Sequence, residues 1–139
     1  MTLRSSIHHR SKADIAGFAR LALEILKANA SASLERIHKV YVQTRDPELK
    51  GALEKCFASY NMIVKVHLRE ALNAMDKGDY KVVKQRAYNA GIQAESCDTK
   101  FKNLASLPLR DNNRYVYNLC AITVSIVNKL LQPNLLTST

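Results

Sequence analysis

The chain has 139 residues, of which 47% are hydrophobic, four are Gly and three are Pro. This length and composition indicate one folded domain and exclude a disordered or low-complexity chain. No apolar run reaches the roughly 18 residues that a membrane-spanning helix needs, so no membrane partner is expected. The net charge of +9 raises the question of a polyanionic partner.

The basic residues are dispersed along the chain, and their densest region is 1–45, with eight Lys and Arg against three acidic residues. Aromatic residues do not interleave with them, and no known nucleic-acid-binding motif accompanies the charge. Nucleic acid is therefore not expected as a partner, although a basic nucleic-acid-binding bundle is kept as an alternative. Acidic cell-wall polymers, an acidic protein surface or a merely soluble basic surface would explain the charge equally well.

The first helix is predicted to follow a loose N-terminal arm, residues 1–10, which is basic and lacks the apolar run of a signal peptide. Ser11 is expected to cap this helix, with Asp14 in the capping-box position. Around residues 29–33 the apolar stripe weakens, and the helix is expected to bend or to expose its middle there. The predicted buried face extends to about Thr44 and comprises Ile15, Phe18, Ala19, Ala22, Ile25, Leu26, Ile37, Val40 and Tyr41.

The second and third helices have clear start and stop signals. Asp46-Pro47-Glu48 combines an N-cap, a proline suited to the first helical position and an acid that favours the helix dipole. The second helix is predicted to end at about Lys77, where Gly78 suits the left-handed conformation. Asp79 is expected to cap the third helix, which continues to about Ala105.

Both helices carry an apolar seam whose members are spaced by three and four residues. The second-helix seam comprises Leu49, Leu53, Cys56, Tyr60, Ile63, His67, Ala71 and Ala74, and the third-helix seam comprises Tyr80, Val83, Ala87, Ala90, Ala94, Cys97, Phe101 and Leu104. If the helices pack antiparallel about the turn at 76–79, Cys56 and Cys97 come nearly level on facing seams. The pattern therefore predicts a disulfide between them, worth about 4 kcal/mol on the chain-entropy model.

The fourth helix is predicted to begin at Asp111, after a break at residues 106–109, and to end before Pro133. Residues 133–139 are expected to form a flexible tail. The apolar positions of this helix are Val116, Leu119, Cys120, Thr123, Ile126, Val127, Leu130 and Leu131. Four helices with short connections predict an all-α, antiparallel up-down-up-down four-helix bundle over residues 11–132 with one interhelical disulfide.

Residues that could carry chemistry are few. Glu35-Arg36-Ile37-His38 is a single Glu-x-x-His pair, whereas a di-iron site in a bundle needs two pairs and further carboxylates. His67 on a seam is more typical of a hydrogen-bonded core residue than of a ligand, and Cys120 among apolar residues indicates a buried, inert thiol. We expect no metal site, no cofactor and no catalytic residue, so the chain is not expected to be an enzyme.

The residues together resemble the plant invertase/pectin methylesterase inhibitor domain family. The resemblance covers about residues 11–131 and rests on Asp46-Pro47-Glu48-Leu49-Lys50-x-Ala52-Leu53-x-x-Cys56-x-x-x-Tyr60, Lys77-Gly78-Asp79-Tyr80, Ala94-Glu95-Ser96-Cys97-x-x-x-Phe101 and Leu119-Cys120-Ala121-Ile122. It implies a bundle with a disulfide between the second and third helices. It also implies inhibition of plant invertase (beta-fructofuranosidase) or of pectin methylesterase in a one-to-one complex.

The resemblance implies a target-binding hairpin tip made of Gly78, Asp79, Tyr80, Lys81 and Val82. In the invertase-inhibiting branch a Pro-Lys-Phe segment of this connection enters the sugar site, and here only Lys81 of that segment is kept. A cation suits a glycosidase cleft lined by two carboxylates. The string Ala94-Glu95-Ser96-Cys97 is closer to the invertase-inhibiting branch, so invertase is slightly favoured as the target. From pattern alone, the plainer interpretation of the tip is a well-capped turn.

Family members normally begin with a helical hairpin that carries its own cysteine pair, whereas residues 1–10 contain no cysteine. We therefore expect self-association through the surface left by the missing hairpin. The resemblance implies secretion to the apoplast and cell wall, or a vacuolar location, and the sequon at Asn29 would then be open to glycosylation. The alternative from another class is a helical interaction or scaffold bundle without inhibitory activity.

Overall fold

The computed structural model describes residues 3–101 and 107–132, and within these the side chains of 11–101 and 109–132. The elements in chain order are α1 (Leu3–Gln43), α2 (Pro47–Met62), the π-helical η1 (Ile63–His67), α3 (Leu68–Asp76), α4 (Tyr80–Lys100) and α5 (Leu107–Leu130). The described residues contain no strand. No helix within them is long and apolar enough to cross a membrane.

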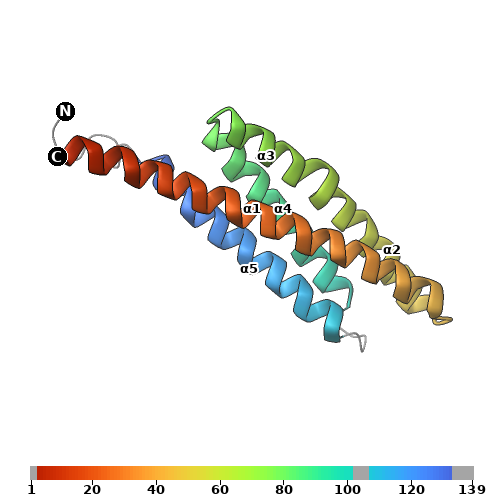
Figure 1. Ribbon diagram of the computed structural model, residues 1–139. Helices are drawn as coiled ribbons and strands as arrows, with labels where there is room; N and C mark the ends of the chain where they lie inside the picture. The colour runs from red at the N-terminus through yellow and green to blue at the C-terminus, as the bar shows by residue number, and fades with distance from the viewer. Residues whose placement is uncertain (1–2, 102–106, 133–139) are drawn as a thin grey trace.

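The helices form an antiparallel bundle in which α2, η1 and α3 together make one arm (Figure 1). The α1 helix packs against this arm and against α5, and α4 also packs against the arm and α5. The α1 and α4 helices are therefore diagonal partners across the bundle. The predicted all-α four-helix bundle is confirmed.

The core is built from the predicted seams. Cys56, Tyr60 and Ile63 of the second helical arm are fully buried, as are Ala90 and Ala94 of α4. The largest side chains with almost no exposed surface are Tyr60, Phe101, Leu23, Leu26, Ile37, Leu53, Ile63, Leu68, Val83, Val116, Val127 and Thr123. Because α4 contributes mostly alanine and glycine to this core, its backbone can lie close to its neighbours.

The caps at the start of α2 and α4 lie where they were predicted. The Asp46 carboxylate accepts a hydrogen bond from the Glu48 backbone N–H, and Pro47 occupies the first turn of α2. The Asp79 carboxylate accepts one from the Val82 backbone N–H at the start of α4. Each cap satisfies a donor that the helix itself leaves unpaired.

Three helix boundaries differ from the sequence predictions. The α1 helix begins at Leu3, so residues 3–10 are helical where a loose arm was predicted, and Ser11 lies inside the helix instead of capping it. The α5 helix begins at Leu107 instead of Asp111, because a proline in the first helical turn loses no intrahelical hydrogen bond. The α4 helix ends at Lys100, and the predicted tail 133–139 lies outside the described residues.

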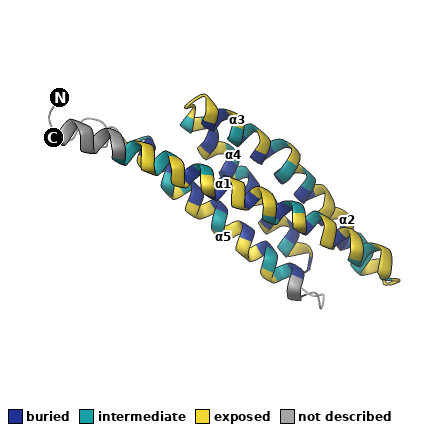
Figure 2. Ribbon diagram, in the orientation of Figure 1, coloured by how far each residue is buried: buried dark blue, intermediate teal, exposed yellow. Residues whose placement is uncertain are grey.

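The α1 helix also differs from its predicted face. Ala30 and Ser33 are buried and the helix is continuous through residues 29–33, so only part of the middle, including Ala32, is exposed. Conversely, Phe18 and Ile25 were predicted to be buried, but they are exposed. Figure 2 shows exposed and buried segments alternating along α1. The apolar residues of α1 are spread over more than one face, and sequence spacing alone did not separate the two.

Candidate functional site

The tip between α3 and α4 is a closed, hydrogen-bonded turn. The Asp79 backbone N–H donates to the Ala74 carbonyl at 2.9 Å, and the Gly78 N–H donates to the Met75 carbonyl at 3.1 Å. These two bonds make a Schellman motif, which requires a left-handed residue after the helix. Gly78 supplies it with a φ of 69°, as the sequence predicted. The turn is therefore fixed by its backbone.

The predicted tip residues differ in how much surface they offer. Gly78, Asp79 and Lys81 are exposed, whereas Tyr80 and Val82 are half-buried and pack against the core. Lys81 therefore extends into solvent from the first turn of α4, while its neighbours Tyr80 and Val82 pack against the core. The structure brings these five residues together in one short segment, and their role as a binding surface stays a prediction.

Both acidic side chains at the tip are engaged within the protein. Asp76 forms an ion pair with Arg20 of α1, which also ties the tip to the neighbouring helix. Asp79 is held against the N-terminus of α4 by its capping bond. The exposed lysines Lys77, Lys81 and Lys84 thus dominate the charge that this end presents to solvent. Such a surface attracts a negatively charged partner.

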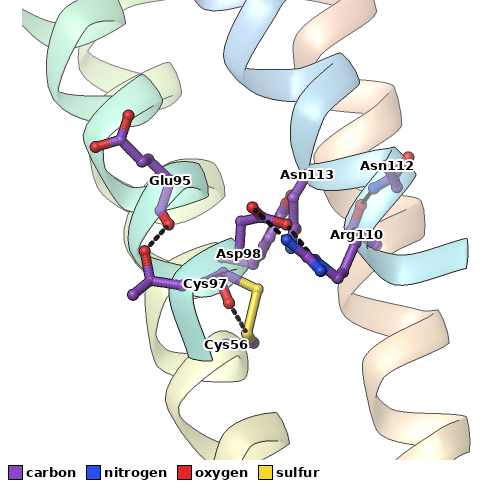
Figure 3. The surroundings of a disulfide bond; sticks show 10 residues. Cys56, Glu95, Cys97, Asp98, Arg110, Asn112 and Asn113 are labelled. Carbon is purple, nitrogen blue, oxygen red and sulfur yellow. Dashed lines mark hydrogen bonds and ion pairs between the residues drawn. A yellow bond between two sulfur atoms is a disulfide. The ribbon is translucent and has the colours of Figure 1, made fainter. Parts of the chain in front are cut away.

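The predicted disulfide joins α2 to α4 near the other end of the arm (Figure 3). Cys56 and Cys97 have Cα atoms 4.6 Å apart and are separated by 41 positions in the chain. Beside it, Arg110 of α5 pairs with Asp98 of α4 at 3.2 Å. Together these links hold three helices at one end, while the Schellman turn closes the other.

A buried polar network crosses the core next to the disulfide. The Tyr60 hydroxyl of α2 donates to Asn113 Oδ1 of α5 at 2.7 Å. Asn112 of α5 hydrogen-bonds to the Ser33 hydroxyl of α1, which donates to the Asn29 carbonyl. Burial raises the pKa of Tyr60, so its proton stays in this network at any ordinary pH. These bonds fix the rotation of three helices.

The π-helical turn η1 ends at His67, a buried residue that faces α4. Nη1 of Arg86 lies 3.4 Å from Nδ1 of His67, and Arg86 also pairs with Glu70. Burial and then the Arg86 charge lower the pKa of His67, while Glu70 acts in the opposite direction. His67 is therefore a neutral core residue here, which agrees with the structural role predicted for it.

A second surface, which was not predicted from the sequence, lies between α4 and α5. A groove of about 400 Å³ is lined by Ala87, Tyr88, Gly91, Ile92, Glu95, Tyr117, Cys120, Ala121 and Val124. Tyr88 and Ile92 on its rim are 62% and 49% exposed. Tyr88 and Ile92 are four residues apart and lie outside the predicted seam of α4, and this spacing could have indicated a second apolar surface.

The floor of this groove depends on Gly91 and Cys120. A Cβ atom added to Gly91 would lie 3.3 Å from the Cβ of Cys120, so the Cys120 side chain packs directly against the Gly91 backbone. Burial raises the pKa of the Cys120 thiol to about 12, which keeps it protonated and unreactive. The groove is thus a mainly apolar surface that also carries two tyrosines and Glu95, and its thiol stays protonated.

The remaining sequence-predicted site is the sequon at Asn29. Asn29 lies in the middle of α1 and is half-buried, and its Oδ1 is buried without a hydrogen-bond partner among the described residues. Glycosylation there stays a prediction. Within the described residues, no group of three or more His, Cys, Asp or Glu side chains is placed to hold a metal ion.

Fold and surfaces together define a disulfide-bridged helical bundle that presents a capped, cationic tip and an apolar groove. The chain matches the model of the plant invertase/pectin methylesterase inhibitor family over residues 2–126, and it belongs to that family. Members of this family inhibit enzymes and are not themselves enzymes.

Two Arabidopsis thaliana relatives represent the two inhibitory activities. The chain is 29% identical over 126 residues to the cell wall / vacuolar inhibitor of fructosidase 1, a match that covers 91% of this chain and 60% of the relative. It is 25% identical over 119 residues to pectinesterase inhibitor 1, covering 84% of this chain and 67% of that protein. The chain thus spans about three-fifths of the length of the first relative.

Solved structures show the same fold. A crystal structure of a pectin methylesterase inhibitor from Arabidopsis thaliana has a TM-score of 0.79 at 25% identity, covering 84% of this chain and 78% of that chain. A mutant form of such an inhibitor has a TM-score of 0.80 at the same identity and coverage.

Proposed function

We propose that this protein inhibits a plant invertase by inserting the α3–α4 tip into the enzyme's carboxylate-lined cleft in a one-to-one complex. The observation that carries the proposal is Lys81, which is exposed in the first turn of α4, directly after the turn fixed by the Gly78 Schellman motif. A rigid tip loses little conformational entropy on binding, and its lysines complement the two carboxylates of a glycosidase. The relative with 29% identity, named as an inhibitor of fructosidase, supports this target.

Pectin methylesterase is the second candidate target. The exposed tyrosines and Ile92 of the α4–α5 groove favour it, because they offer an apolar helix face of the kind that docks on a broad protein surface. Pectinesterase inhibitor 1 and the two solved inhibitor structures support the same alternative. We propose a cell-wall or vacuolar location for either target, following the name of the first relative.

Titration against both purified enzymes at mildly acidic pH tests the choice. Residual activity should fall linearly and reach its minimum at one inhibitor per enzyme for the true target. Lys81→Glu should abolish inhibition of invertase, because it places a carboxylate against the enzyme's carboxylates. Ile92→Lys should instead abolish inhibition of pectin methylesterase if the groove is the interface.

The matched control is Lys55→Glu, which makes the same change of net charge at an exposed α2 position beside the disulfide, away from the tip. It should leave inhibition unchanged, because Lys55 does not contact the enzyme in the proposed complex. Both variants change the net charge equally, so a loss of inhibition seen only in Lys81→Glu cannot come from weaker long-range attraction. Circular dichroism should show both variants folded. If the wild-type chain inhibits neither enzyme, the inhibitor proposal is wrong and the non-inhibitory scaffold is favoured.

A further inference from the structure

The outer face of α1 carries an apolar stripe that the bundle does not cover. Phe18, Leu21 and Ile25 on it are 61%, 56% and 40% exposed, and Ala28 and Ala32 continue it as exposed residues. The steps between these residues are three, four, three and four, which is the spacing of a coiled-coil seam. Soluble monomers seldom leave such a continuous apolar stripe in water.

The two ends of the stripe carry opposite charges at equal distances from its centre. Asp14 lies eleven positions before Ile25 and Arg36 lies eleven positions after it, and both side chains are exposed. Eleven residues are close to three helical turns, so Asp14, Ile25 and Arg36 fall on one line along the helix. A second α1 running antiparallel would bring each Asp14 opposite the partner's Arg36.

Side-chain sizes on the stripe are also complementary about Ile25, with a large residue on one side and a small one at the same distance on the other. Phe18 lies seven positions before Ile25, and Ala32 lies seven positions after it. An antiparallel crossing at Ile25 therefore sets each phenylalanine ring against a methyl group of the other copy. A parallel crossing would instead place Asp14 on Asp14 and Phe18 on Phe18, which combines charge repulsion with a gap at Ala32.

From this arrangement we propose that α1 forms a two-fold symmetric, antiparallel homodimer centred on Ile25. The contact is isologous, as expected for a closed dimer. One helix from each protomer makes an interface at the low end of the known range, below about 1,200 Å² in total, so the dissociation constant should be on the order of 0.1 mM. Because α1 is diagonal to α4, the α4–α5 groove stays open in the dimer.

Sedimentation equilibrium over a concentration series that reaches the millimolar range measures the dimer directly. Ile25→Lys should weaken association at least about tenfold, because two lysines would meet on the two-fold axis. The matched control is Ile122→Lys on α5, where Ile122 is 52% exposed and lies outside the stripe. It should leave the dissociation constant unchanged, and circular dichroism should show both variants folded.

A charge exchange tests the antiparallel direction. Asp14→Arg and Arg36→Asp should each weaken the dimer several-fold at low salt, and the double variant should recover the wild-type constant. In a parallel dimer the wild type and every variant would oppose like charges at positions 14 and 36, so neither single variant would weaken association, and that result would also overturn the proposal. A chain that stays monomeric throughout, an equal loss from Ile122→Lys, or no recovery in the double variant would each overturn the proposal. None of these results depends on which enzyme the protein inhibits.

Discussion

His67 shows how single residues in this bundle take their charge state from neighbours on another helix. It comes from η1, but the groups that face it are Arg86 of α4 and Glu70 of α3. Burial removes water from the ring, and protonation would also place a second cation beside Arg86. Both effects lower the pKa of His67, with burial the larger of the two.

The stability of the protein should therefore decrease as the solution becomes more acidic. In the unfolded chain His67 takes up a proton as the pH falls through about 6.5, whereas in the folded chain it resists until a lower pH. The unfolded state then binds more protons, so the free energy of unfolding falls between neutral pH and the folded-state pKa. Urea denaturation at pH 7 and pH 5 measures this change.

The comparison with His67→Gln isolates the contribution of this residue. Glutamine keeps a polar side chain of similar size but does not titrate, so the variant should lose less stability between the two pH values than the wild type. Equal losses in the two proteins would mean that carboxylates elsewhere cause the acid sensitivity. That result would contradict the role given to the contact with Arg86.

At the scale of elements, the contact between α4 and α5 is the most extensive in the bundle. Alanine and glycine on α4 let the two backbones approach at Gly91, where the Cβ of Cys120 fills the space that a larger residue would need. The same close packing shapes the groove, because the small residues Gly91 and Cys120 lie between Tyr88 of α4 and Tyr117 of α5. Stability and the candidate groove thus depend on one contact.

Gly91→Leu should destabilise the protein by about 1–3 kcal/mol, because the added side chain must push α4 away from α5 or leave its preferred rotamer. Gly17→Leu is the matched control, since Gly17 lies in exposed α1 with nothing within 4 Å of an added Cβ. It should be neutral or stabilising, because leucine favours the helix over glycine. Chemical denaturation of both variants measures the difference, and equal effects would disprove the close approach.

For the whole molecule, the disulfide and the tip act at opposite ends of the same helix pair. The bond between Cys56 and Cys97 reduces the conformational entropy of the unfolded chain. The Schellman turn and the ion pair of Arg20 with Asp76 set the geometry of the tip in the folded protein. Inhibition through the tip requires the fixed tip geometry, because the tip must meet the enzyme in one conformation. The disulfide is required only to keep the bundle folded.

Replacing both bridged cysteines, Cys56→Ala with Cys97→Ala, should lower the free energy of unfolding by about 4 kcal/mol on the chain-entropy model. The far tip should keep its geometry, so inhibition should persist at temperatures where the variant is folded. Non-reducing denaturation measures the loss, and a thiol assay of the denatured wild type should find one free thiol, Cys120. A loss below about 1 kcal/mol would show that the bond adds little to this bundle.

The sequence by itself determined the four-helix organisation, the caps of α2 and α4 and the bridge of this protein. Asp46, Gly78 and Asp79 act on backbone groups within a few residues, and the seams that carry Cys56 and Cys97 are local repeats. Caps and seams can be predicted from the sequence because each one depends on residues that lie close together in the chain. Regularity of the seams was enough to place the two cysteines on facing sides.

Only the tertiary structure decided which way each helix is turned. The stripe of Phe18 and Ile25 could have faced inward, and it faces outward because Leu23, Leu26 and Ala30 fill the core on the other side of α1. The groove at Gly91 and the contact of His67 with Arg86 likewise join residues from different helices. Helix rotation depends on the combined packing of all four helices, and periodicity along one helix does not contain that information.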